Sequence, residues 1–342
     1  MAAAMENYKL FTPLQLADGL KLKNHIVYGP TIRARSDPVS HVPLERNMQY
    51  YEQRASAGLV ITEGTSRASG ALAHGPPVAL VLPPDQRGRV GLGHAVRRRP
   101  HAQRPRRARG LREGAPEEIP GVVVMFRQSA VRAKRAGFDG LELLANNGYL
   151  MDQFLQSSTN QRTDKYGGSF ESRYRFLHEI VEALKTVFPA SRVAVRLSPN
   201  GVFGGMDSDG NTEMFTYAFE RLSEHGLAYL AILDGFGFGR YPTMTRPLTV
   251  FDTKKACKGF VMANNSYSRS TAEGTVSSGA ADLVSFVCLY LPNPDLVEHF
   301  QNDWPLNPVI DAEYFWDTSK GDECYHTFKP YQPTNGKTEQ KN

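Results

Sequence analysis

Short apolar runs that recur along the chain are the feature that most constrains its fold. These runs do not alternate strictly between polar and apolar residues, which is the pattern of strands covered on both faces in a parallel sheet. They predict seven strands, at residues 25–29, 58–62, 140–144, 193–197, 228–233, 259–263 and 282–286.

Segments with helical periodicity lie between these runs. The clearest has an apolar stripe at i, i+3 and i+4 spacing from Phe170 to Val187, with charged residues on the opposite face. Helices are also expected at 126–136, 215–225 and 271–278. Strands that alternate with helices imply βαβ units and a parallel sheet.

The interval from residue 65 to residue 137 is long enough for one further unit, and eight units would close a (β/α)8 barrel, also called a TIM barrel. An open doubly wound sheet is the alternative, but no Gly-x-Gly-x-x-Gly sequence follows an early strand. We therefore expect an α/β barrel as a single domain over residues 1–330, with a disordered tail over 331–342.

Composition and length exclude several classes of protein. The 342 residues contain 41% hydrophobic and 22% charged residues, as is usual for a globular protein, and no apolar run is long enough to span a membrane. The first residues do not read as a secretory signal, and the three cysteines lack metal-ligand or disulfide spacing. We expect a cytoplasmic protein without a metal site, in which His25, His41 and His225 are surface or packing residues.

Residues 82–116 depart from the rest of the chain because they are rich in arginine, proline and glycine. Ten arginines lie between residues 87 and 112 without an acidic residue among them, so the net charge of +5 is local in origin. Such a composition does not supply a barrel strand, and we expect the third βα unit to be degenerate or missing. The neighbouring strands would then pair directly or leave two unpaired edges.

Three origins of residues 82–116 stay open: a shifted reading frame or other degeneration, a genuine arginine-rich insertion, and an ordinary loop. A nucleic-acid-binding arm is a weaker interpretation, because arginines attract phosphate but no interleaved aromatic residues offer base stacking.

Polar residues follow two of the predicted strands where a barrel carries its chemistry, at the C-terminal ends. Asn146, Asn147 and Tyr149 follow the strand 140–144, while Arg196 and Ser198 end the next one. Two simpler interpretations stay open at this point. The Asn-Asn-Gly sequence is typical of a turn, and Arg196 could form a structural ion pair in the barrel mouth.

Several motifs in a fixed order resemble the Old Yellow Enzyme family of FMN-dependent ene-reductases. The resemblance covers residues 8–75 and 117–310. It is carried by Leu10-Phe-Thr-Pro-Leu14, Tyr51-Glu-Gln-Arg-Ala-Ser-Ala-Gly58, Gly137-Phe-Asp-Gly-Leu-Glu142, Asn147-Gly-Tyr-Leu-Met-Asp-Gln-Phe154, Asn160-Gln-Arg-Thr-Asp-Lys-Tyr-Gly-Gly-Ser169, Val195-Arg-Leu-Ser-Pro199 and Asn293-Pro-Asp-Leu296.

The resemblance implies FMN at the C-terminal mouth of the barrel and a reaction in two steps. NADPH (or NADH) gives hydride to the flavin, which then reduces the C=C bond of a small α,β-unsaturated carbonyl compound. A monomer or homodimer is expected, without a membrane or nucleic-acid partner.

The family's residues carry over by motif. Asn147 matches the second member of the pair that holds the substrate carbonyl, Tyr149 the proton donor, and Arg196 the arginine that supports the reduced flavin. Further cofactor contacts are expected from residues beside the flavin ring and from a phosphate-binding turn: Pro30, Thr31, Gly64, Asn264, Asn265 and Ser266.

Four positions depart from the family pattern. Leu144 stands in place of the histidine that is the first carbonyl-holding residue, and losing one such donor typically costs about 3 kcal/mol of transition-state stabilisation. Ile32 replaces a flavin-contacting threonine, and Val287-Cys288 replaces a Gly-Arg pair whose arginine binds the phosphate. Asp322 stands where an aromatic residue usually lines the substrate pocket. We therefore expect impaired activity, and the alternative is an inactive barrel that has lost flavin binding.

Overall fold

Eight strands close a barrel in the computed structural model, which describes residues 7–37, 42–64, 78–82, 116–202, 206, 208–235, 246–311 and 313–332, with the backbone alone for 78–82. The order around the barrel is β10-β3-β4-β5-β6-β7-β8-β9. The strands are β3 (Ile26–Tyr28), β4 (Leu59–Ile61), β5 (Val78–Leu82), β6 (Gly140–Ala145), β7 (Val193–Leu197), β8 (Leu230–Leu233), β9 (Val261–Asn264) and β10 (Leu283–Phe286).

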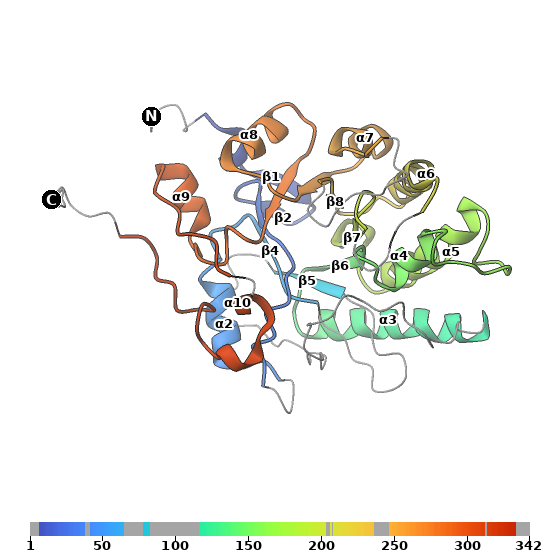
Figure 1. The fold of residues 1–342 in the computed structure, drawn as a ribbon, viewed down its shortest axis with the longest axis horizontal. Helices are drawn as coiled ribbons and strands as arrows, with labels where there is room; N and C mark the ends of the chain where they lie inside the picture. The colour runs from blue at the N-terminus through green and yellow to red at the C-terminus, as the bar shows by residue number, and fades with distance from the viewer. Residues whose placement is uncertain are drawn as a thin grey trace.

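Helices surround the strands, as Figure 1 shows. They are α2 (Glu45–Glu52), α3 (Ile119–Arg135), α4 (Leu150–Leu155), α5 (Phe170–Lys185), α6 (Asn211–Ser223), α7 (Val250–Ala256), α8 (Arg269–Ser277), α9 (Leu296–Asn302) and α10 (Glu313–Trp316). The α/β barrel predicted from the sequence is confirmed, because all seven predicted strands and the four predicted helices lie at these positions. Among the described helices, none combines the length and the apolar character needed to cross a membrane.

The third position of the barrel differs from the expectation. β5 fills it, so β4 and β6 neither pair directly nor leave open edges, and that prediction is wrong. β5 runs antiparallel to both neighbours, with Val60 opposite Leu82 and Leu143 opposite Val78. The third strand of the barrel is therefore present, but it runs in the opposite direction to the other seven. The arginines at 87–112, His41 and tail residues 333–342 lie outside the described residues.

Two apolar shells make up the core because successive strand residues point to opposite faces. On β6, Leu141 and Leu143 pack outward against the helices, whereas Leu144 belongs to the cluster inside the barrel. The hairpin of β1 (Leu14–Ala17) and β2 (Leu20–Leu22) adds Leu20 and Leu22 to the inner cluster, next to Ala194 and Tyr229. These last two residues stand at the start of β7 and just before β8, so the hairpin covers the N-terminal end of the barrel.

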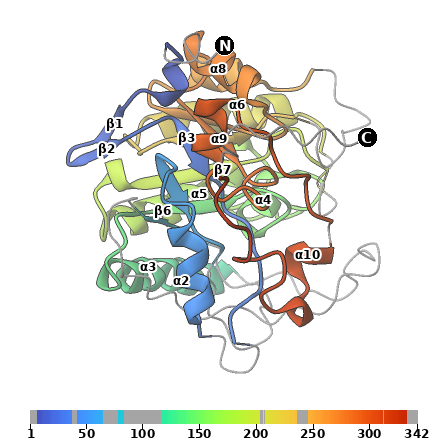
Figure 2. The ribbon, with the colours of Figure 1, turned by 90° about the vertical axis from the view of Figure 1, so that its left-hand side faces the viewer.

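A stack of aromatic rings and guanidinium groups joins the C-terminal segment to α2, and Figure 2 shows the two side by side. The ring of Tyr325 lies 4.2 Å from the ring of Tyr50 on α2 in a parallel stack. The guanidinium of Arg54, which follows α2, lies 3.6 Å from the centre of the same Tyr50 ring. Arg33 contacts both rings at 5.3 Å. Cation–π contacts of this kind gain strength when they are shielded from water, as here, where both arginines are fully buried.

Gly58, immediately before β4, sets the relative position of β3 and β4. Its N–H donates to Ile26 O (2.8 Å) and to Asn24 Oδ1 (2.7 Å), and a Cβ added to it would lie 2.0 Å from Asn24 O. Any side chain at this position would force the two strands apart.

We predict that Gly58→Ala lowers the free energy of unfolding by at least about 2 kcal/mol, because backbone atoms must move to accept the new methyl group. Gly274→Ala is the matched control: it lies in α8 with nothing within 4 Å of its added Cβ, so it should stabilise by about 0.5–1 kcal/mol. Urea unfolding followed by circular dichroism measures both. Equal effects of the two substitutions would contradict this account.

Candidate active site

The residues predicted to act in the site gather at one end of the barrel. Seven strands run parallel, so their C-terminal ends share one rim. Pro30 and Thr31 follow β3, Gly64 follows β4, and all three are half-buried. The remaining predicted residues lie on or after β6, β7 and β9: Asn147, Tyr149, Arg196, Asn264, Asn265 and Ser266.

Arg196 of β7 is held by a buried ion pair inside the barrel. Its Nε lies 2.6 Å and its Nη2 3.1 Å from the two carboxylate oxygens of Glu142 on β6. The Tyr229 hydroxyl donates to the same carboxylate at 2.9 Å, and burial together with this carboxylate raises the pKa of Tyr229 well above its usual range. All three side chains are at most 3% exposed, so the charges are well compensated, as a buried pair requires.

The same guanidinium links two of the predicted cofactor residues. Arg196 Nη1 donates to Asn264 Oδ1 at 2.9 Å, and Asn264 Nδ2 donates to Ser285 O on β10 at 2.9 Å. A guanidinium carries five N–H donors, and the bonds to Glu142, Asn264 and the Met262 sulfur use four of them. One Nη1–H therefore has no partner among the described contacts.

Asn147 and Tyr149 lie on a turn between β6 and α4 that is tied to β7. Asn147 and Gly148 have φ values of 52° and 69°, in the left-handed region. Asn147 N donates to Ser198 Oγ (2.9 Å), and Gly148 N donates to Asp152 Oδ2 (2.9 Å). These bonds hold the backbone of the turn in place. Tyr149 is half-buried against the inner cluster and is the N-cap residue of α4.

The turn after β9 keeps a backbone shape that glycine normally supplies. Asn265 has φ 118° and Ser266 has φ 57°, backbone angles that glycine adopts most readily. The α8 helix begins just beyond, with Ser268 as its N-cap. Successive N–H groups in such a turn form a concave surface that suits an anion.

Several buried polar atoms near the rim have no hydrogen-bond partner in the described part of the chain. They are Glu63 Oε1 after β4, Asn146 Oδ1 after β6, Asp234 Oδ1 after β8 and Ser285 Oγ on β10. Burial raises the pKa of Glu63 and of Asp234. Unpaired buried polar atoms cost free energy, and their gathering at one rim suits a polar ligand that would supply the missing partners.

The structure also places the positions that depart from the family pattern. Leu144 points into the inner cluster and is 7% exposed, so it offers no hydrogen bond where the family has a donor. Val287 and Cys288 follow β10, with Cys288 exposed. Asp322 pairs with Arg46 at 2.9 Å.

The sequence analysis did not predict three residues of the site: Glu142, Asp152 and Tyr229. Glu142 had a usable signal, because a charged residue within an otherwise apolar strand that is covered on both faces must have a buried partner. Tyr229 had none, since its bond to Glu142 spans 87 residues. Asp152 had none either, since its contact with Ser198 spans 46 residues.

Comparisons with known proteins agree with this geometry. Residues 100–307 match the sequence profile described as the NADH:flavin oxidoreductase / NADH oxidase family. The chain is 31% identical to 12-oxophytodienoate reductase 7 of Oryza sativa subsp. japonica, over 90% of this chain and 91% of that protein. It is 30% identical to the "Probable flavin mononucleotide-dependent alkene reductase" of Leishmania infantum, over 92% of this chain and 96% of that protein.

The solved structure of morphinone reductase in complex with tetrahydroNAD has a TM-score of 0.75 to this chain at 29% identity. The alignment covers 97% of this chain and all of that one.

The Asp152 carboxyl makes the stability of the folded protein depend on pH. Burial raises its pKa to about 6, although hydrogen bonds from Gly148, Gln156 and Ser198 act in the opposite direction. A folded pKa above the unfolded value of about 3.9 means that the folded protein binds this proton more tightly. This group therefore lowers stability as pH rises from about 4 to about 6, by roughly 3 kcal/mol.

We predict that Asp152→Asn removes this decline and makes the protein more stable than wild type at pH 7. Asp252→Asn is the control of opposite sign, because hydrogen bonding to Arg246 lowers the pKa of Asp252 to about 2 and its charge stabilises the fold at pH 7. Urea unfolding at pH 4, 5, 6 and 7 measures both. A slope between pH 4 and 6 that is unchanged in the Asp152 variant would contradict the assignment.

Proposed function

The chain belongs to the NADH:flavin oxidoreductase / NADH oxidase family and is of the Old Yellow Enzyme type, and we propose that it uses FMN and NADPH to reduce the C=C bond of α,β-unsaturated carbonyl compounds. The observation that carries the proposal is the Arg196 guanidinium, held at the rim by Glu142 and Asn264 with one N–H available. FMN would supply the redox chemistry, taking hydride from the nicotinamide and delivering it to the β-carbon.

The residues at the rim offer hydrogen-bond partners for the flavin ring but no positive charge for the phosphate. The available N–H of Arg196 suits the N1–C2=O edge of the ring, where negative charge gathers on reduction. The unpaired atoms of Asn146 and Ser285 offer further partners for polar groups of the ring. The turn at Asn265 and Ser266 suits the phosphate, but Val287 and Cys288 give no positive charge there.

The substrate carbonyl would lie against the turn that follows β6. Asn147 is the side-chain donor for its oxygen, and Tyr149 donates the proton to the α-carbon. The hydrogen bonds from the turn's backbone to Ser198 and Asp152 fix both residues in place. Leu144 withholds the second donor, so the charge that develops on the carbonyl oxygen is held by one side chain instead of two.

The alternative is a barrel that no longer holds FMN. It is favoured by the missing positive charge at Val287-Cys288, because losing a charge-assisted phosphate contact costs about 1.5–3 kcal/mol of affinity. The test is the visible absorption of the purified full-length chain after incubation with FMN and gel filtration. A folded but colourless preparation would contradict the proposed function and establish the alternative.

We predict that Tyr149→Phe slows reduction of 2-cyclohexenone by the FMN-loaded protein at least about a hundredfold, because the proton donor is lost. Reduction of the flavin by NADPH, measured separately under anaerobic conditions by the loss of flavin absorption, should not change. If the variant reduces the enone at the wild-type rate, Tyr149 is not the proton donor.

We predict that Leu144→His accelerates enone reduction by roughly tenfold to a hundredfold, because it restores a donor beside Asn147. Leu144→Met is the matched control, since it keeps an apolar side chain of similar volume and adds no donor. Steady-state consumption of NADPH at saturating enone measures both variants. A gain that the methionine variant shares would show that packing, not hydrogen bonding, limits the wild-type rate.

A further inference from the structure

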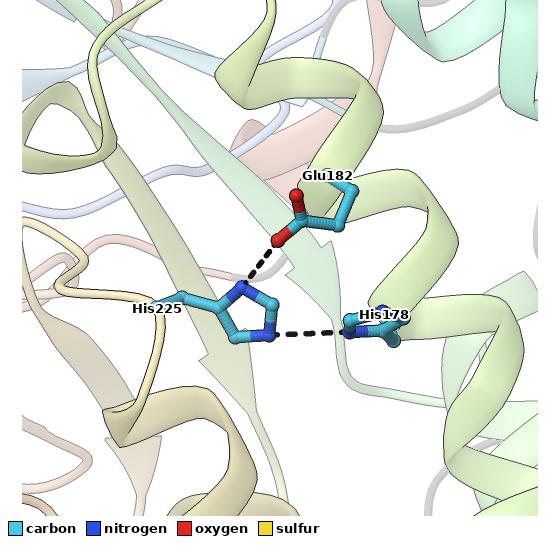
Figure 3. Close-up of side chains that lie close together, drawn as sticks. All are labelled: His178, Glu182 and His225. Atoms are coloured by element: carbon cyan, nitrogen blue, oxygen red, sulfur yellow. Dashed lines mark hydrogen bonds and ion pairs between the residues drawn. The ribbon is translucent and has the colours of Figure 1, made fainter.

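A second cluster of polar residues lies outside the barrel, between α5 and the residues that follow α6. A cavity of about 410 Å³ is lined by residues of both elements there. Figure 3 shows His178 and Glu182, one turn apart on α5, pointing toward His225, which lies just past the end of α6. One ligand atom from each of these three residues lies within 4.8 Å of the others.

The contact of His225 with Glu182 orients its imidazole so that Nε2 faces His178. The Nδ1 of His225 lies 2.8 Å from Glu182 Oε1, so a proton on Nδ1 is held by the carboxylate and the lone pair is left on Nε2. That Nε2 lies 3.3 Å from Nδ1 of His178. A carboxylate that orients an imidazole through its far nitrogen is the usual arrangement around metal-bound histidines.

The distance between the two facing nitrogens matches a metal site. Two nitrogens bound to a tetrahedral zinc ion at 2.0–2.1 Å lie about 3.3 Å apart, and the two imidazole nitrogens here are 3.3 Å apart. Because His178 is exposed on α5, an ion can reach this pair from solvent.

The charges around the cavity are nearly balanced. Arg175 pairs with Glu171 at 3.4 Å and Arg221 with Glu224 at 2.9 Å, which leaves Lys185 as the cation closest to the histidines. Lys185 Nζ lies 2.7 Å from Glu182 Oε1 and 3.3 Å from His225 Nδ1. It opposes a second cation, but it acts on the nitrogen of His225 that faces away from His178.

The lone pair on Nε2 of His225 is the one that a metal ion would bind. A neutral imidazole has the free lone pair that a metal requires. The Tyr174 hydroxyl, 3.3 Å from Nε2, is the other group that competes for this lone pair.

We propose that His178 and His225 bind a divalent transition-metal ion, with zinc as the first candidate, and that Glu182 orients His225 for this role. The sequence gives no sign of the site, because 47 residues separate the two histidines, and it led us to expect no metal. The ion would connect the helices on either side of β7 in the chain. Its effect is on the stability of the outer layer, apart from the chemistry at the rim.

Zinc chloride titrated into the full-length chain, with binding followed by isothermal calorimetry, tests the proposal. We expect saturable binding of one ion, and at least tenfold weaker binding for His178→Ala and for His225→Gln. Glu171→Gln is the matched control, because it removes a carboxylate from the same cavity without removing a ligand, and its affinity should equal that of wild type. The absence of saturable binding to wild type, or equal affinity of His178→Ala, would overturn the proposal.

Two further variants test the assigned roles. Lys185→Met removes the opposing charge and should bind zinc more tightly, whereas Glu182→Gln should bind it more weakly. Thermal unfolding gives an independent reading: zinc should raise the melting temperature of wild type and leave that of His178→Ala unchanged. Because His178 is exposed, this variant is expected to keep the fold, which its circular dichroism spectrum checks.

Discussion

Closure of the strand ring is the constraint on which the rest of the structure depends. A ring with a gap would present two rows of unpaired N–H and C=O groups, and the rim that carries the site residues would lose its shape. β5 fills the gap although it runs against its neighbours, because an antiparallel strand satisfies the backbone as well as a parallel one. Leu82, the last residue of β5, lies opposite Val60 on β4 and near the start of β6. The chain therefore leaves β5 at the N-terminal end of the barrel, away from the rim that carries the site residues. A regular unit would leave the strand at the rim.

The sequence predicted most of the barrel because its strands are short apolar runs separated by helical periodicity. An apolar run does not indicate the direction of its strand, because Val78-Ala-Leu-Val-Leu82 is equally apolar in a parallel and in an antiparallel orientation. The positions of Asn147, Arg196 and Asn264 at one rim were also predictable, because parallel strands end together. The contacts between them were not, since the bonds of Arg196 to Glu142 and Asn264 join three different strands.

The buried pair of Glu142 and Arg196 serves both the fold and the site. The two interpretations of Arg196 that the sequence left open are therefore compatible: it forms an ion pair and still has one N–H without a partner among the described contacts. Removing Arg196 would leave the Glu142 carboxylate buried and unpaired, at a cost of several kcal/mol in stability. A loss of activity in such a variant would not distinguish a cofactor role from a failure of the barrel, which is why Tyr149 and Leu144 are the more informative positions.

The departures at Leu144 and at Val287-Cys288 act on different quantities. A missing carbonyl donor lowers the rate of the chemical step, and no concentration of cofactor restores it. A missing phosphate contact lowers the affinity for FMN, which a higher FMN concentration offsets by mass action. Since the two losses fall on separate steps, they do not compound once the site is saturated. Under the proposed function, a barrel that carries both changes is a slow enzyme when supplied with FMN, and Asn147 and Tyr149 are the residues proposed to act on the substrate.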